Sequence, residues 1–143
     1  MYTTLEDILK QIPEAELIQL TVDEPDEDSE VDEDVVDAVI ARVDGEIDSY
    51  VGVKYSVPLA TVPAVINQHA IAMDLHYLYS RRPTIKENET IRANFDDAIK
   101  WLDKLAKGQV TLGIDPPPPA PSVSAGRFNS NPRKFSDDSM KGM

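Results

Sequence analysis

The densest group of side chains able to do chemistry in this sequence is an acidic stretch near the N-terminus. Nine of the twelve residues from 23 to 34 are aspartate or glutamate. Alternating acids over residues 26–32 resemble the opening of a calcium-binding EF-hand loop, but Val31 stands where that loop needs glycine, and the twelfth position falls on Asp37 within an apolar helical pattern. We interpret the stretch as a solvated loop, with specific calcium binding as the alternative. The residues expected to face solvent are Asp23, Glu24, Asp26, Glu27, Asp28 and Glu30.

Histidine is the next candidate for chemistry. His69 and His76 are seven residues apart, so on one helix they lie about two turns from each other, too far to bind one metal ion together. We expect them to be partly buried and hydrogen-bonded on a core helix. Trp101, the only tryptophan, is expected to pack at the edge of the core, with a role as an interface anchor as the alternative.

No pattern in the sequence predicts an enzyme. There is no glycine-rich phosphate loop, and cysteine is absent, which excludes disulfides, thiolate catalysis and cysteine-ligated zinc. We therefore predict no catalytic residue, no cofactor and no metal. No apolar run reaches the about 18 residues of a membrane span, and the N-terminus lacks the pattern of a signal peptide, so we expect no membrane segment.

Charge divides the 143 residues into two parts. Residues 1–114 hold 23 acidic and 10 basic side chains, a net charge of −13, whereas residues 115–143 hold 3 acidic and 4 basic ones, a net charge of +1. An acidic domain repels phosphates, so nucleic-acid binding is not expected, although DNA can slide past such a surface. We divide the chain into a helical domain over 1–114 and a Pro-rich extended C-terminal arm over 115–143.

Hydrophobic periodicity predicts an all-α fold, a small helical bundle of three main helices with short N-terminal helices. Thr3 and Glu6 have the spacing of a capping box for the first short helix. The main helices are expected over about 32–51, 63–80 and 91–107, and Gly45 within the first is expected to let another helix approach closely. Residues 109–114 are expected to form a short strand or extended arm, paired with residues 55–59 or with a neighbouring subunit.

The C-terminal arm carries aromatic residues that no core explains. Prolines 116–119 exclude a helix there and form a stiff spacer, yet Phe128 and Phe135 follow, each directly after a basic residue. We interpret them as apolar anchors on a tethered arm that its basic residues steer toward an acidic neighbour. The predicted binding residues of the arm are Arg127, Phe128, Arg133, Lys134, Phe135, Met140 and Lys141.

Several stretches occur in the order and spacing of a known family. The quoted segments are VDGEIDSY at 43–50, YSVPL at 55–59, VP at 62–63, LYSRR at 78–82, GQVTLG at 108–113, KFS at 134–136 and MKG at 140–142. In these segments the chain resembles the Mu-like prophage head–tail connector, or adaptor, family of head-completion proteins. The resemblance covers nearly the whole chain, and the acidic loop is the clearest departure from it.

The resemblance implies a structural virion protein of the phage neck, assembled in the host cytoplasm. Such adaptors form a homo-oligomeric ring, expected to be dodecameric, beneath the portal protein, and they present a docking surface to a tail-side stopper or tail terminator protein. DNA would pass through the channel without specific binding. Apart from the resemblance, we expect the acidic loop to face that channel or solvent. The alternative from a different class is an acidic regulator that binds a host protein, or a DNA mimic, and the acidic loop motivates it.

Overall fold

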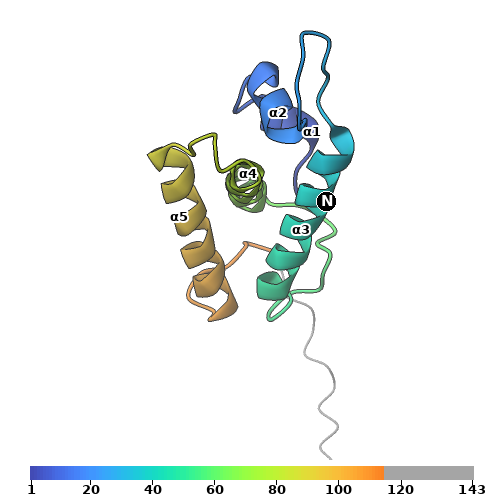
Figure 1. The fold of residues 1–143 in the computed structure, drawn as a ribbon. Helices are drawn as coiled ribbons and strands as arrows, with labels where there is room; N and C mark the ends of the chain where they lie inside the picture. The colour runs from blue at the N-terminus through green and yellow to red at the C-terminus, as the bar shows by residue number, and fades with distance from the viewer. Residues whose placement is uncertain (115–143) are drawn as a thin grey trace, which may run out of the picture.

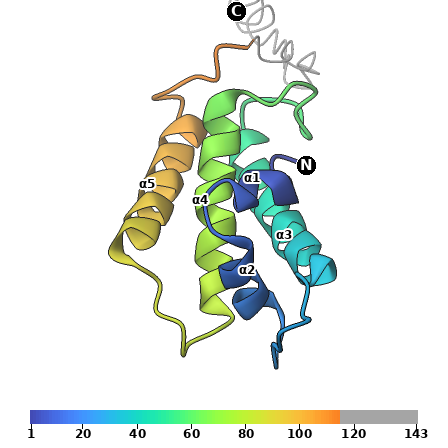
Figure 2. The same ribbon diagram turned by 90° about the horizontal axis from the view of Figure 1, so that it is seen from above.

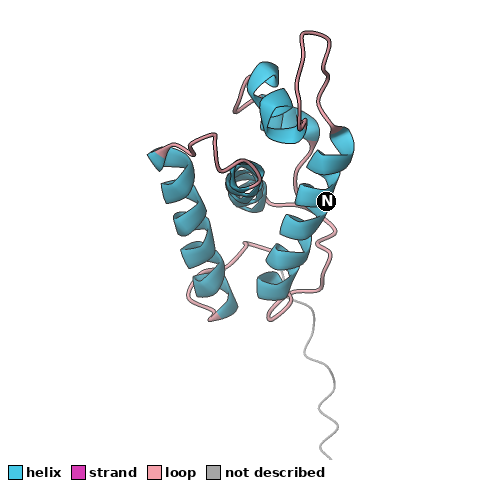
Figure 3. Ribbon diagram, in the orientation of Figure 1, coloured by secondary structure: helices cyan, strands magenta, loops and turns pink. Residues whose placement is uncertain are grey.

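The computed structural model describes residues 1–114, and within that range the fold is entirely helical (Figures 1 and 3). This confirms the predicted all-α class with three main helices and short N-terminal ones. The five helices are α1 (Leu5–Leu9), α2 (Glu14–Thr21), α3 (Glu33–Val51), α4 (Ala64–Ser80) and α5 (Glu89–Ala106).

Helix α4 is the centre of the bundle. It packs against α3 on one side and α5 on the other, and the short helices α1 and α2 lie against both α3 and α4 (Figure 2). Because neighbours surround it, α4 carries apolar residues on several faces, and Asp74 is its only charged residue other than histidine. In this view α4 lies between α5 on one side and the short helices α1 and α2 on the other (Figure 2).

Two clusters of buried side chains fill the bundle. One cluster joins the C-terminal half of α3, the first half of α4 and the second half of α5, and it includes Tyr2, Tyr55, Leu59 and Leu112 from outside the helices. The other cluster joins α1 and α2 to the opposite ends of α3 and α4. Tyr77 packs against both clusters, so the two halves form one continuous interior.

Side chains at the helix starts agree with the sequence rules, with one correction. Asp32 caps α3 and Asn88 caps α5, each through its side-chain oxygen. The capping box of α1, however, is formed by Thr4 and Asp7, so the predicted pairing of Thr3 with Glu6 is wrong. Thr3 is instead buried, because its hydroxyl is used in a long-range hydrogen bond described below.

Residues 109–114 differ from the predicted strand. Gly108 adopts a left-handed backbone (φ +75°) and ends the α5 region, as its place after the last lysine predicts. The following segment forms no strand within the described residues, and neither does 55–59. The two segments still meet, because the backbone N–H of Leu112 donates to the Tyr55 hydroxyl at 3.1 Å. One side-chain acceptor thus replaces the expected backbone ladder.

The expectation for Gly45 is also wrong. A Cβ atom added there would meet nothing within 4 Å, and the residue is exposed on α3. No helix approaches it, so packing in this chain does not require the glycine. Within residues 1–114, no helix is both long enough and apolar enough to cross a membrane.

Candidate functional site

The acidic loop connects α2 to α3, and all six of its predicted solvent-facing residues are exposed. The loop has some internal order, since the Asp26 carboxylate accepts hydrogen bonds from the Asp28 backbone N–H at 3.0 Å and from the Ser29 hydroxyl at 2.8 Å. Its last acids lie at the start of α3, where Asp32 accepts from the Val35 N–H at 3.2 Å. Carboxylates at this end are favoured by the helix dipole.

Two arginines at the end of α4 fix the base of this loop. Arg81 donates to the carbonyl of Leu20 at 2.6 Å, and Arg82 donates to the carbonyl of Val22 and to the Asp23 carboxylate, the latter at 2.8 Å. These carbonyls end α2 and have no partner within that helix, so the arginines satisfy them. The paired arginines of the LYSRR segment thus tie α4 to α2.

Neutralising the exposed part of the loop should leave stability unchanged. The variant Asp26→Asn, Glu27→Gln, Asp28→Asn and Glu30→Gln keeps a side-chain oxygen at position 26 for the hydrogen bonds from Asp28 and Ser29 and removes four like charges, so the free energy of unfolding should change by less than about 0.5 kcal/mol, or rise. Urea denaturation monitored by circular dichroism measures this. A loss of several kcal/mol would show that the loop is part of the folded core.

The histidines contribute to packing at two separate places. His76 lies with its ring stacked on Phe95 at a centroid distance of 3.9 Å and has its Nδ1 2.6 Å from the Glu87 carboxylate. The ring of His69 lies 4.8 Å from that of Trp101, which packs at the edge of the core as predicted. Over residues 1–114, no three His, Asp or Glu side chains gather closely enough to hold a metal ion.

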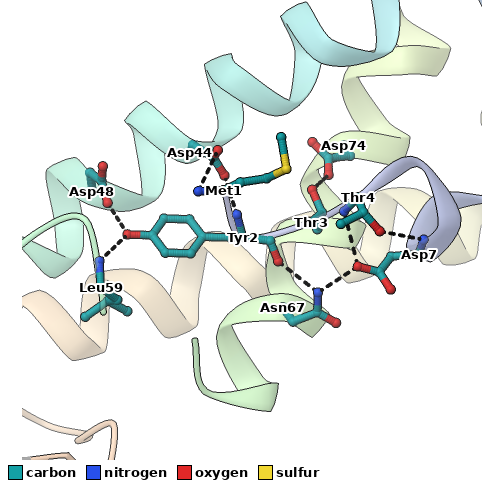
Figure 4. Close-up of polar contacts among 10 residues, drawn as sticks. All are labelled: Met1, Tyr2, Thr3, Thr4, Asp7, Asp44, Asp48, Leu59, Asn67 and Asp74. Atoms are coloured by element: carbon teal, nitrogen blue, oxygen red, sulfur yellow. Dashed lines mark hydrogen bonds and ion pairs between the residues drawn. The ribbon is translucent and has the colours of Figure 1, made fainter. Parts of the chain in front are cut away.

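The N-terminal residues form a polar network that the sequence did not predict (Figure 4). Tyr2 is 3% exposed, and its hydroxyl donates to Asp48 of α3 and accepts from the backbone N–H of Leu59 at 3.2 Å. Its backbone N–H donates to Asp44 at 2.9 Å, and its carbonyl accepts from the Asn67 amide of α4 at 2.8 Å. The first residues of the chain therefore join α3, α4 and the connection between them.

Asp74 is the most unusual ionisable group in this network. Its side chain is fully buried on α4, Oδ2 accepts from the Thr3 hydroxyl at 2.5 Å, and Oδ1 has no hydrogen-bond partner. Burial, with a smaller contribution from the Asp44 carboxylate, raises the pKa of Asp74 to about 7, although the Thr3 hydrogen bond opposes the shift. The sequence carries a signal for this group, because Asp74 is the one acid in α4.

A groove of about 590 Å³ lies along α4, between α5 and the turn that follows α1. Its floor and walls come from three elements: α4, α5 and the turn after α1. The lining side chains are Gln11, Asn67, Gln68, His69, Ile71, Ala72, Leu75, Asn94 and Asp97. The predicted residues of the C-terminal arm, Arg127 to Lys141, lie outside the described residues.

Comparison with known proteins places this architecture among phage proteins. The profile of the family described as bacteriophage Mu, Gp36 matches residues 2–130. The Mu-like prophage FluMu protein gp36 of Haemophilus influenzae is 34% identical over 84 residues, which span 59% of this chain and 57% of that protein. Gene product J of Escherichia phage Mu is 25% identical over 114 residues, which span 80% of this chain and 77% of that protein. The profile match continues beyond the helical domain into the C-terminal arm.

Proposed function

The chain belongs to the bacteriophage Mu Gp36 family, and from this membership we propose that it is a structural virion protein, a head–tail adaptor bound beneath the phage portal. The adaptor would complete the filled head and form the surface on which the tail docks. The observation that carries the proposal is the family match over residues 2–130 of a small helical domain with a net charge of −13 over residues 1–114.

The charge of the domain suits a wall around a DNA channel. Several copies in a closed ring would present many carboxylates and few unpaired cations, so phosphates would be repelled and DNA would pass without binding. A head-to-tail interface between identical subunits closes into such a ring when its rotation permits. We propose a homo-oligomeric ring, with the portal on one side and a stopper or tail terminator protein on the other.

The C-terminal arm is the proposed contact to the portal or to a neighbouring subunit. The arm is basic overall where the domain is acidic, and its two phenylalanines supply the apolar anchors that interfaces use. This assignment predicts that binding depends on the arm and not on the acidic loop.

A second candidate is an acidic regulator or DNA mimic, which the exposed carboxylates of the loop favour. The two functions make opposite predictions. A regulator would bind a basic host protein through the loop and would lose that binding on neutralisation of Asp26, Glu27, Asp28 and Glu30, whereas an adaptor would keep its portal binding in the same variant.

Replacing both phenylalanines should weaken portal binding. We expect the double variant Phe128→Ala, Phe135→Ala to fold normally and to bind purified portal at least about tenfold more weakly, since each anchor contributes about 1 kcal/mol or more. Co-sedimentation with portal rings measures this, with the neutralised-loop variant as the control. In phage, deletion of the gene should give DNA-filled heads without tails. Heads joined to tails in the deletion would overturn the proposed function.

A further inference from the structure

The groove on α4 is built from neutral polar and apolar side chains. Ile71, Ala72 and Leu75 form an apolar strip, and carboxamides from three elements surround it. Asp97 is the only carboxylate in the lining, and burial lowers the pKa of the His69 imidazole, which is therefore neutral at pH 7. A volume of about 590 Å³ lies within the range of binding pockets for small ligands or single side chains.

Gln11, Gln68 and Asn94 are exposed at the groove, so their amide groups face solvent and are accessible to a ligand. Across residues 1–114, the side-chain amides of Gln11, Gln68 and Asn94 make no hydrogen bond to another protein group, and Asn67 uses only its amide nitrogen. Each carboxamide offers a donor and an acceptor. The backbone of an extended peptide also offers alternating donors and acceptors, with which these carboxamides can pair. The apolar strip accommodates one apolar side chain, and Asp97 pairs with one cation, so the groove fits a peptide segment that carries both.

The C-terminal arm contains such a segment. Arg127 and Phe128 are followed by Asn129, Ser130 and Asn131, so the only charge near this phenylalanine is positive. Phe135 is followed by Asp137 and Asp138, which Asp97 and the acidic domain would repel. The family match ends at residue 130, so it includes the first phenylalanine and excludes the second.

The arm is long enough to reach the groove. Thirteen residues lie between Ile114 and Phe128, and the fourteen steps from one residue to the next, at 3.3–3.6 Å each, span at most about 50 Å. Helix α4, with 17 residues, is only about 26 Å long at 1.5 Å per residue. A groove on the same chain or on an adjacent copy is thus within reach.

We propose that the groove on α4 is the receptor for residues 123–130 of the C-terminal arm, with Phe128 over Ile71, Ala72 and Leu75 and with Arg127 beside Asp97. The carboxamides pair with the backbone of the segment. This contact uses only the chain itself and does not depend on the adaptor function. While Phe128 occupies the groove, only the later part of the arm, around Phe135, is free for another partner, so a portal contact through both phenylalanines requires Phe128 to leave the groove.

Disulfide trapping in the full-length chain tests this proposal, because the natural sequence has no cysteine. The variant Gln68→Cys, Asn129→Cys places one thiol at the groove and one beside Phe128. The control Ser49→Cys, Asn129→Cys uses an equally exposed residue on α3, which does not line the groove. Under mild oxidation the groove pair should cross-link at least about tenfold faster than the control pair. Size on a non-reducing gel tells whether the segment comes from the same chain or from a second copy.

Two further substitutions make the test specific. Adding Phe128→Ala should reduce the groove cross-link to the control rate, while adding Phe135→Ala should leave it unchanged. Fluorescence of Trp101, the only tryptophan, gives a second measurement without cysteines, because its ring lies against His69 in the groove wall. Phe128→Ala should shift the emission and Phe135→Ala should not. Equal cross-linking of both pairs, or equal effects of the two alanine substitutions, would overturn the proposal.

Discussion

Replacing Asp74 by asparagine is expected to remove most of the dependence of stability on pH between pH 4 and pH 7. In the folded protein, burial without a partner for Oδ1 raises the pKa of this carboxyl to about 7, from its ordinary value of 3.8. The folded state therefore holds a proton that the unfolded state has already released in this range. By linkage, the contribution of Asp74 to stability is greatest below pH 4 and is lost as pH rises toward 7.

The expected size of this effect is large. At about 1.4 kcal/mol per pKa unit, the shift corresponds to roughly 4 kcal/mol lost from the free energy of unfolding between pH 4 and pH 8. Asparagine stays neutral at every pH and can still accept from the Thr3 hydroxyl. At the position of Oδ1, which has no partner, its amide brings two N–H groups in place of one acid O–H, so the variant should be less stable than the wild type at low pH and more stable than it at pH 8.

Urea denaturation of both proteins at pH 4, 6 and 8 gives the free energy of unfolding as a function of pH. The difference between the two proteins isolates the contribution of Asp74, because the other carboxylates contribute equally to both. Thr3→Val is the informative control, because the Thr3 hydrogen bond lowers the pKa of Asp74. Removing that bond should steepen the dependence on pH, not flatten it. Parallel curves for Asp74→Asn and the wild type would show that Asp74 is ionised in the folded state.

The sequence predicted the helices well because their signals are local. The spacing of Val36, Val43 and Ile47 predicted both the extent of α3 and its buried face, and the exposure of the acidic loop follows from its charge alone. Arg81 and Arg82 follow directly after α4, where cations interact favourably with the dipole of their own helix. They instead bind the last carbonyls of α2, a partner that only the packing of α2 against α4 brings within reach.

The candidate binding surface could not be predicted in the same way. The groove combines Gln11, Asn67 and Asn94 from three elements, and no spacing in the sequence relates these positions to one another. In the sequence its carboxamides are indistinguishable from ordinary surface residues. Only the packing of α4 with α5 and with the turn after α1 brings them together in one groove. The proposed anchoring residues of the arm, by contrast, were identified from the sequence alone. Phe128 and Phe135 are apolar residues in a segment without helical periodicity, where no core accounts for them.

Tyr2 lies outside any periodic pattern, yet its replacement should be among the most damaging single changes in the domain. Its ring packs in the core with Val43, Ile47 and Ile66, and it is 3% exposed. Truncation of a buried aromatic side chain to alanine costs about 3–5 kcal/mol, through lost burial and the cavity that remains. We expect Tyr2→Ala to lower the free energy of unfolding by that amount, and the loss is measurable by urea denaturation at pH 7.

Tyr2→Phe separates the contribution of the hydroxyl from that of the ring. Phenylalanine keeps the packing but leaves the Leu59 N–H without its acceptor and Asp48 without its donor. An unsatisfied buried donor costs about 1–3 kcal/mol, so Tyr2→Phe should fall between the wild type and Tyr2→Ala. Hydrogen exchange at the Leu59 amide should accelerate in Tyr2→Phe, because the tyrosine oxygen is its acceptor.

The ionisation of Tyr2 gives the same contact a dependence on pH. Burial and the hydrogen bond to Asp48 raise the pKa of Tyr2 to about 12, so the folded state keeps its phenolic proton after the unfolded state has released it above pH 10. The contribution of the hydroxyl should therefore be present below pH 10 and decline as pH rises toward 12. Tyr2→Phe should lack this part of the alkaline loss, whereas the contribution of Tyr77, whose pKa is also raised to about 12, remains. If the wild type and Tyr2→Phe lost stability equally above pH 10, the hydrogen bond of the phenol to Asp48 would not contribute, and the N-terminal residues would be held by packing and by the backbone hydrogen bonds of Tyr2 to Asp44 and Asn67.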